Sequence, residues 1–396
     1  MKSFKYFLKE ESAGAEEPRQ IKHLTHVEDR PLQNGSKGTE HAISSLKSAA
    51  EHIKSGKKSS ELTTKYDGSP ALVYGHHPET GKFFVASKSA FNKTPKINYT
   101  NADIEKNHGH APGLADKLKT ALKHLPKIAP THGVYQGDMM FSHDDIKHDK
   151  HGSHFHPNPS GLTYTAHGEK SAKTKKAQMG IITHLTYHGK DAQHLNASHE
   201  VDHENFKQHP DVFTVDPRHD TSKVHFAKPA QQTFDKHIAA AQAIHDKGGE
   251  DMYASTKMHQ GVSGPLETYI NHTVRSGEEP SAEGLKKHIE SKANKEIDKL
   301  KTEKGKEKKK QEMMVHHFTI DKNKQHYDNL LKMHSHLQKA KNVLIHTLNQ
   351  HQDFEHTHHG EAANPEGYVF HHGKDTDKFV NRKEFSARNF AGTRNI

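Results

Sequence analysis

The chain has 396 residues, and its 58 Lys and Arg residues outnumber its 49 Asp and Glu residues, which gives a formal net charge of +9 with neutral histidine. Histidine is unusually frequent, with 41 residues, and cysteine is absent. Without cysteine the chain forms no disulfide, iron–sulfur cluster, cysteine-ligated zinc site or thiol nucleophile. Only 31% of the residues are hydrophobic, so we expect two to three domains with thin helical or irregular parts rather than one large core.

No apolar run approaches the roughly 18 residues that a membrane-spanning helix needs. The N-terminal segment also lacks the apolar stretch and cleavage site of a signal peptide. We therefore expect a cytoplasmic protein with no membrane partner. The positive net charge favours polyanionic partners, although it is mild for a chain of this length.

In chain order, residues 1–38 are expected to form a mostly irregular arm. Apolar residues over 39–54 recur at helical spacing and predict a helix that stops before Gly56. A second helix is expected over 113–125, where leucines share one face. The other segments of this half have β character and predict strands at 61–75, 82–89, 133–141, 161–167, 179–187 and 211–227.

The pattern becomes helical over 229–350. The predicted helices lie at 234–246, 282–314 and 325–349, and the last carries an apolar stripe typical of helix packing. The basic run at 299–310 is interpreted as a solvated helix or linker in preference to a nucleic-acid site. Residues 364–385 return to a strand–turn–strand pattern.

These segments predict an α+β fold in which antiparallel sheets from both ends of the chain form one body and a helical insertion extends from it. The expected divisions are an N-terminal arm (1–38), the first part of the body (39–228), the helical insertion (229–355) and the C-terminal strands of the body (356–396).

The sharpest local signal is the run Lys65, Tyr66, Asp67 and Gly68, in which a strand ends on a lysine and an Asp–Gly turn follows. An amine is a nucleophile only when it is neutral, and cations nearby favour the neutral form of a lysine. Taken alone, such a run is more often a surface turn than a catalytic site. Further charged positions follow on later predicted strands, at Lys88, Asp138, Glu366 and Lys378.

Basic and acidic residues on successive strands in this order resemble the covalent nucleotidyltransferase superfamily, which includes ATP-dependent DNA ligases, RNA ligases and mRNA-capping guanylyltransferases. The resemblance implies a ligase-like body, ATP and Mg²⁺ or Mn²⁺ as cofactors, and a nucleic-acid substrate with a 5′-phosphate, RNA before DNA. It implies that Lys65 accepts the nucleotide and that Asp67 and Gly68 lie beside it. Glu366 would hold the metal, and we expect it within one nucleotide's length of Lys65.

The same resemblance gives roles to four further residues. Lys88 and Lys378 would contact phosphate, and Asp138 would stand where the superfamily usually has a glutamate that contacts the ribose. His184 occupies the region of the aromatic residue that stacks on adenine in the superfamily, and is the expected substitute for it.

The chain departs from the superfamily's pattern at several positions. Pro70 stands where DNA ligases and capping enzymes commonly have an arginine, and Phe370 is followed by His371 and His372 where a lysine or arginine is common. The segment after Lys378 is too short for a C-terminal OB domain, so an RNA-ligase-like arrangement is nearer.

The N-terminal MKSFKYFL, the segment HLTHVED and the run KYDGSPALVYG are also notable. With them, most of the chain resembles a family of large tailed-phage proteins without an assigned activity, which implies the cytoplasm of an infected bacterium. One alternative is therefore a catalytically reduced, nucleic-acid-binding or virion-associated phage protein on the same scaffold. Another is an enzyme that transfers AMP to a protein or a small molecule.

Two histidine-rich segments, at 143–156 and 356–359, contain residue types that bind transition metals. Their spacing matches no defined metal motif, so the first is interpreted as a flexible polar loop, and the same interpretation holds for the second. The sequence contains no phosphate-binding P-loop, which leaves P-loop ATP hydrolysis unsupported.

Overall fold

A computed structural model describes residues 24–92, 94–157, 161–188, 196–256, 264–373 and 375–384. The fold is of the predicted α+β class. The described residues form two compact units. The first contains residues 24, 58–219 and 352–367, and the second contains 25–57, 220–351 and 368–384. The N-terminal part of the expected arm, 1–23, lies outside the described residues.

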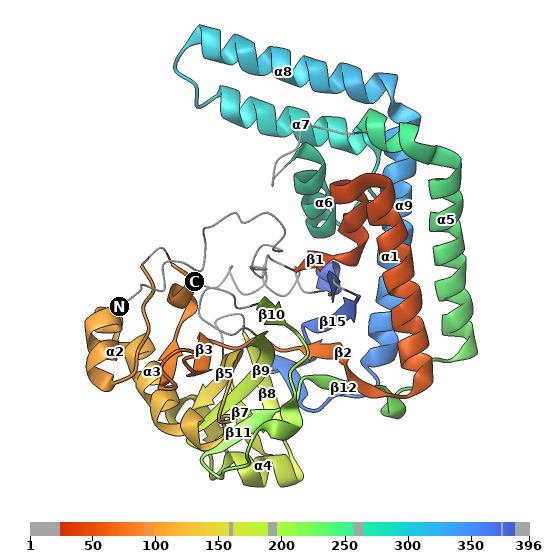
Figure 1. Ribbon diagram of the computed structural model, residues 1–396. Helices are drawn as coiled ribbons and strands as arrows, with labels where there is room; N and C mark the ends of the chain where they lie inside the picture. The colour runs from red at the N-terminus through yellow and green to blue at the C-terminus, as the bar shows by residue number, and fades with distance from the viewer. Residues whose placement is uncertain are drawn as a thin grey trace. The chain divides into compact units, whose positions relative to one another are not determined.

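The first unit is built on a six-stranded sheet in the order β10–β9–β5–β3–β4, with β11 parallel to β9 (Figure 1). Its antiparallel strand pairs agree with the sequence-based expectation. The bounds are β3 Ala71–His76, β4 Phe83–Ala86, β5 Val134–Ser142, β9 Met179–His188, β10 Asn196–Ser198 and β11 Val212–Val215.

Alternating residues of this sheet enter two different cores. Met139 and Ile181 pack with the apolar residues of helices α2 (Asn101–His108) and α3 (Pro112–His124). Their neighbours Met140 and Ile182 belong instead to a second, aromatic-rich core. The helices therefore cover one face of the sheet, and the aromatic core fills the other.

A five-stranded sheet in the order β14–β13–β8–β7–β6 completes the aromatic core. Phe155 from this sheet lies 5.1 Å from Phe141 between ring centroids, and its ring stacks on Tyr164 at 5.5 Å. The bounds are β6 Ile146–His148, β7 Ser153–Phe155, β8 Leu162–Ala166, β13 Glu355–His358 and β14 Glu361–Ala363. Because β13 pairs with β8, the C-terminal part of the chain re-enters the first unit.

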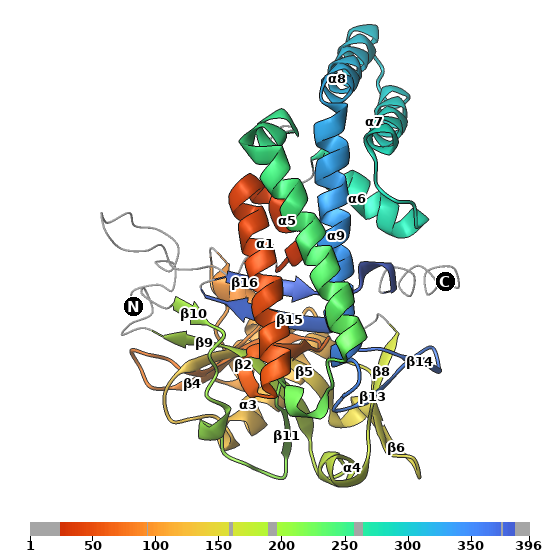
Figure 2. The ribbon, with the colours of Figure 1, turned by 90° about the vertical axis from the view of Figure 1, so that its right-hand side faces the viewer.

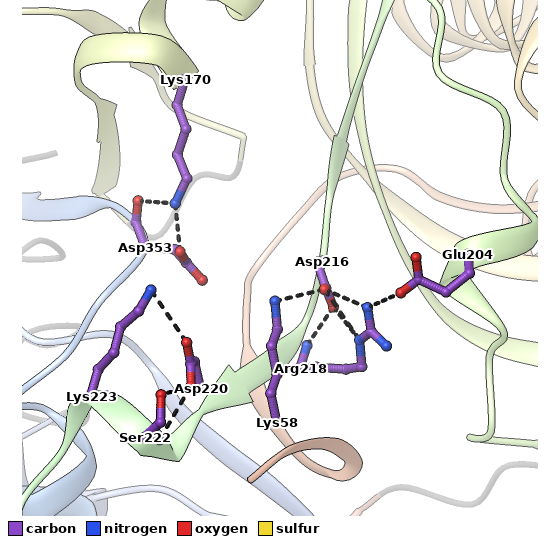
Figure 3. Close-up of polar contacts among 9 residues, drawn as sticks. All are labelled: Lys58, Lys170, Glu204, Asp216, Arg218, Asp220, Ser222, Lys223 and Asp353. Carbon is purple, nitrogen blue, oxygen red and sulfur yellow. Dashed lines mark hydrogen bonds and ion pairs between the residues drawn. The ribbon is translucent and has the colours of Figure 1, made fainter. Parts of the chain in front are cut away.

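Strand β2 (Lys58–Lys65) is fixed at its beginning by a network of charges (Figure 3). Asp216 accepts hydrogen bonds from Arg218, and Lys58 lies 2.8 Å from the same carboxylate. Burial acts to raise the pKa of Asp216, but the hydrogen bonds from Arg218 and Lys58 outweigh it and lower the pKa to about 2. The network is therefore charged at neutral pH and holds the strand whose other end is Lys65.

The second unit is mainly helical. Helices α1 (Arg30–Ser55), α5 (Lys228–Thr256) and α9 (Lys324–Leu348) pack along one another (Figure 2), and α7 (Ala282–Ile297) pairs with α8 (Glu303–Lys322). The unit also contains α6 Pro265–Ser276, β1 Thr25–His26, β15 Gly367–His372 and β16 Asp375–Phe379, with β16 between β1 and β15. None of the described helices is long and apolar enough to cross a membrane.

Several sequence-based boundaries were wrong. The helix expected from residue 39 begins at Arg30 within the expected arm, with Pro31 in its first turn, a favoured position for proline. The helix expected over 282–314 is two helices, because Thr302 caps a new one by accepting a hydrogen bond from the Gly305 amide. Helix α2 was not predicted.

Candidate nucleotidyltransferase site

Lys65 is the last residue of β2, and the residue after it is anchored in the aromatic core. The ring of Tyr66 lies 5.9 Å from Tyr164 and 5.8 Å from Phe354 between centroids. This burial fixes the backbone of the Lys65–Gly68 run. The side chains of Lys65 and Asp67, on either side of Tyr66, remain partly accessible to water.

Lys65 Nζ forms an ion pair with Glu366 Oε2. The side chain of Glu366 is 5% exposed and that of Lys65 is 23% exposed. The prediction that Glu366 lies within a nucleotide's length of Lys65 is confirmed, although 301 positions separate them in the sequence. A nearly buried carboxylate without a cation beside it would be strongly disfavoured, so the Lys65 ammonium group offsets the cost of burying Glu366.

Hydrogen bonds attach the turn after Lys65 to its neighbours. The Asp67 amide donates to the Tyr164 hydroxyl at 2.9 Å. The Ser69 amide donates to the carbonyl oxygen of Met139 at 2.9 Å, and the Met139 amide donates to that of Pro70 at 3.0 Å. The turn is therefore joined to β5 at the position of Asp138.

The turn packs closely against β5 at Gly68. A Cβ atom on Gly68 would lie 2.6 Å from the Asp138 Cβ and 3.0 Å from the Met139 carbonyl oxygen. Neither neighbour is the end of a flexible side chain, so any larger residue would push the turn away from β5. Glycine at this position keeps Asp67 and Asp138 close together.

We expect Gly68→Ala to lower the free energy of unfolding by about 1–3 kcal/mol, because an added methyl group has no room. Urea unfolding followed by circular dichroism measures this change. Gly113→Ala is the matched control, since a Cβ there meets no atom within 4 Å. Equal stability of the two variants would contradict the close packing of Gly68 against Asp138.

Two groups beside Lys65 have strongly shifted pKa values. Burial raises the pKa of Asp138 to about 7, even though the nearby cations Lys65 and Lys88 act to lower it. Burial, together with Lys65 and Lys88, lowers the pKa of His184 to about 4. His184 is therefore neutral at pH 7, and the pKa of Asp138 lies close to neutral pH. Such opposed shifts within one cluster are typical of functional sites.

The raised pKa of Asp138 predicts a pH-dependent stability. The folded chain holds this proton more tightly than the unfolded chain, so stability falls as pH rises from about 4 to above 7. Asp138→Asn removes the free-energy cost of ionising this buried carboxyl group. It should therefore stabilise the protein by about 2–4 kcal/mol at pH 8 and negligibly at pH 4. Urea unfolding at both pH values measures the difference. A stability gain that is the same at both pH values would show that ionisation of Asp138 is not its cause.

The structure brings together most of the residues that the sequence singled out. Lys65, Asp67, Gly68 and Glu366 are linked by the contacts above, and His184 Nδ1 lies 3.9 Å from Asp138 Oδ2. Lys88 is an exposed residue at the start of a 3₁₀ turn after β4 and is near enough to shift the pKa values of Asp138 and His184. Lys378 lies on β16 of the second unit, where it is paired in register with His26 of β1 and Val369 of β15.

Three residues near this cluster were not predicted. Tyr164 holds the Asp67 amide, and Lys117 on α3 lies 3.5 Å from the Ser69 carbonyl oxygen. The backbone of His184 forms a hydrogen bond with His199, whose pKa burial lowers to about 4. All three come from distant segments, and only the alternation of β8, which directs Tyr164 inward, was a usable signal.

The histidine-rich segment at 143–156 was wrongly predicted to be a flexible loop. It forms the β6–β7 hairpin, in which His154 contacts Asp149 at 3.0 Å and His148 contacts the Ser153 hydroxyl at 2.8 Å. Residues of the second segment form β13. Within the described part of the chain, no group of three or more His, Asp or Glu side chains is arranged to hold a metal ion.

Comparison with known proteins places the chain in one family. Residues 21–394 match a family of unknown function, DUF6267, and the chain therefore belongs to that family. No curated protein and no solved structure matches the chain.

Proposed function

We propose that this member of the DUF6267 family is an ATP-dependent nucleotidyltransferase with a ligase-like body, in which Lys65 accepts AMP. The observation that carries the proposal is the Lys65–Glu366 ion pair, which joins a strand-end lysine to a carboxylate 301 positions away. The packing of Gly68 against Asp138 adds a second carboxyl group to the same place. These acidic and basic residues follow the order of the superfamily pattern, with Asp138 where the superfamily usually has a glutamate.

The reaction needs a neutral amine at Lys65, and water reaches this side chain to take its proton. The Nζ lone pair attacks the α-phosphorus of ATP, a nitrogen–phosphorus bond forms, and the bond to the departing pyrophosphate breaks. Lys88 supplies positive charge beside the reacting phosphate, and the neutral ring of His184 is suited to contact a nucleobase. Burial raises the pKa of Asp138 to about 7, so this carboxyl group can donate a hydrogen bond to a ribose hydroxyl when protonated and accept one when ionised.

The carboxylate of Glu366 suits a Mg²⁺ ion that the protein and the phosphates of a nucleotide bind together. Mg²⁺ often binds through one or two protein carboxylates and the substrate's phosphates, and does not require a complete protein cage. Glu366, a nearly buried carboxylate whose described partner is an ammonium group, would provide the protein ligand. Bound there, Mg²⁺ would neutralise phosphate charge.

The acceptor that fits this proposal is a nucleic acid with a 5′-phosphate, RNA before DNA. AMP passes from Lys65 to the 5′-phosphate, and the lysine amine is released. A hydroxyl group of the second strand end then attacks the activated phosphate, which forms the phosphodiester and releases AMP.

Incubation with α-³²P-labelled ATP and Mg²⁺ or Mn²⁺, followed by a denaturing gel, tests the first step. We expect label to remain on the protein and to be released as AMP by a 5′-phosphorylated RNA. A protein that binds ATP or nucleic acid but never becomes labelled would instead be a non-catalytic binder on this scaffold.

A further inference from the structure

The exposed large hydrophobic side chains of the described residues all lie in the α7–α8 region. Met314 is 54% exposed, Val315 63% and Phe318 71%, and Leu300, between the two helices, is 38% exposed. The first three share one side of α8, since Met314 and Val315 precede Phe318 by four and three positions. We call Met314, Val315 and Phe318 the apolar trio.

The trio lies on the exposed side of α8, and α8 packs against α7 (Figure 1). The contacts with α7 are largely polar: Lys309 pairs with Glu296 at 2.6 Å, and Lys286 pairs with Asp321 at 2.8 Å. Ile320 is the one buried residue of α8. A surface helix normally places its apolar residues inward, so an outward aromatic group indicates a binding surface.

The charges around the trio separate into two classes. Lys306 and Lys309 are neutralised by ion pairs with Glu303, Glu296 and Glu312. Four other lysines of α8 have no such pair in the described part of the chain, and these are Lys304, Lys308, Lys310 and Lys322.

The unpaired lysines lie on both sides of the trio. By helical geometry, Lys304 and Lys322 fall within about 40° of Phe318 around the helix, and Lys308 and Lys310 within about 80°. Three acidic residues, Glu303, Glu307 and Asp321, lie within about 60° of Phe318. Glu303 pairs with Lys306 and Asp321 with Lys286, so the surface keeps an excess of positive charge. It extends along a helix about 30 Å long.

We propose that this face of α8 binds single-stranded nucleic acid, with Phe318 stacking on a base and the unpaired lysines contacting phosphates. An aromatic ring set among cations is the combination that single strands recognise. A second copy of the chain is the weaker fit, because three side chains do not supply the roughly 800 Å² per partner of a stable dimer. The facing lysines would also repel.

The choice of a single strand as occupant draws on the proposed strand-joining function, but the binding itself does not require Lys65. The test measures binding of a fluorescein-labelled U20 RNA to the full chain by anisotropy, from 50 to 300 mM NaCl. Phe318→Ala should weaken binding about tenfold, the loss of one stacked base. Lys304→Ala/Lys308→Ala/Lys310→Ala should weaken it further and reduce the slope of log affinity against log salt by about 2.

The matched control is Lys306→Ala/Lys309→Ala, taken from the same run but ion-paired, which should leave the salt slope nearly unchanged. Lys65→Ala should bind RNA as the wild type does, so loss of the adduct and loss of RNA binding are separate results. Equal effects of the two lysine sets, or no effect of Phe318→Ala, would overturn the proposal. Concentration-dependent self-association that Phe318→Ala abolishes would overturn it in favour of a second copy.

Discussion

Replacement of Lys65 by alanine should abolish labelling of the protein by α-³²P-ATP. The variant should still fold but with a lower free energy of unfolding, because Glu366 loses its ammonium partner. The side chain is partly exposed and sits outside the apolar cores, so its loss removes little packing. It removes the only atom proposed to bond to the α-phosphorus, so we expect a fall of at least about 10³ in the labelling rate. Lys65→Arg should be equally inactive, because a guanidinium group stays protonated.

The matched control is Lys58→Ala, which changes the other end of the same strand and breaks the pair with Asp216. It should cost some stability and retain labelling. Labelling of the wild type should also increase with pH, because only the neutral amine attacks. An adduct that persists in Lys65→Ala would assign the nucleophile to another lysine, and the roles given to Asp138 and Glu366 would lose their basis.

The local part of the candidate site was predictable because neighbouring residues determine it. A β pattern that ends on Lys65 and an Asp–Gly pair that cannot continue a strand define the strand end and the turn within four residues. Gly68 also had an identifiable reason, since a glycine in such a run allows a close approach. The sequence could not say that the approaching residue is Asp138, because that contact depends on the register between β3 and β5.

The distant part of the site was reached only through the superfamily resemblance. No periodicity links Glu366 to Lys65, and the link arises because β13 pairs with β8 and Phe354 packs against Tyr66. Tyr164 and Lys117 were missed for the same reason. Each reaches the turn from a different element, and nothing in its own neighbourhood marks it as more than a core tyrosine or a helix-surface lysine.

The division of the chain into compact units was also only partly predictable from the sequence. The predicted helices between 229 and 350 are present, but the compact unit that contains them also contains α1 and the strands β15 and β16. One buried and one partly buried charge pair help to explain this grouping. Lys341 on α9 pairs with Glu28, both fully buried, and Arg382 pairs with Asp29. A buried charge costs free energy unless an opposite charge pairs with it, and no local sequence pattern predicts which residue is the partner.

Glu366→Gln should reduce labelling by about 10²–10³, the loss expected for one well-placed electrostatic contact. Glutamine keeps the size of the side chain but carries no charge, so it neither pairs with the Lys65 ammonium nor attracts a divalent cation. The reduction should be larger than that of Asp138→Ala, because Asp138 is proposed to contact only the ribose. Labelling rates at several Mg²⁺ and Mn²⁺ concentrations measure both effects.

Two controls separate a role in catalysis from a role in folding. Glu355→Gln changes an exposed carboxylate of the same C-terminal segment, which contacts His167, and should label normally. Urea unfolding of Glu366→Gln reports how much the buried charge pair stabilises the fold, independently of ATP. If Glu366 holds the metal, higher Mg²⁺ or Mn²⁺ should partly restore labelling in the glutamine variant. If raised metal restores nothing while the fold stays intact, Glu366 acts only by positioning Lys65, and the metal must be held elsewhere.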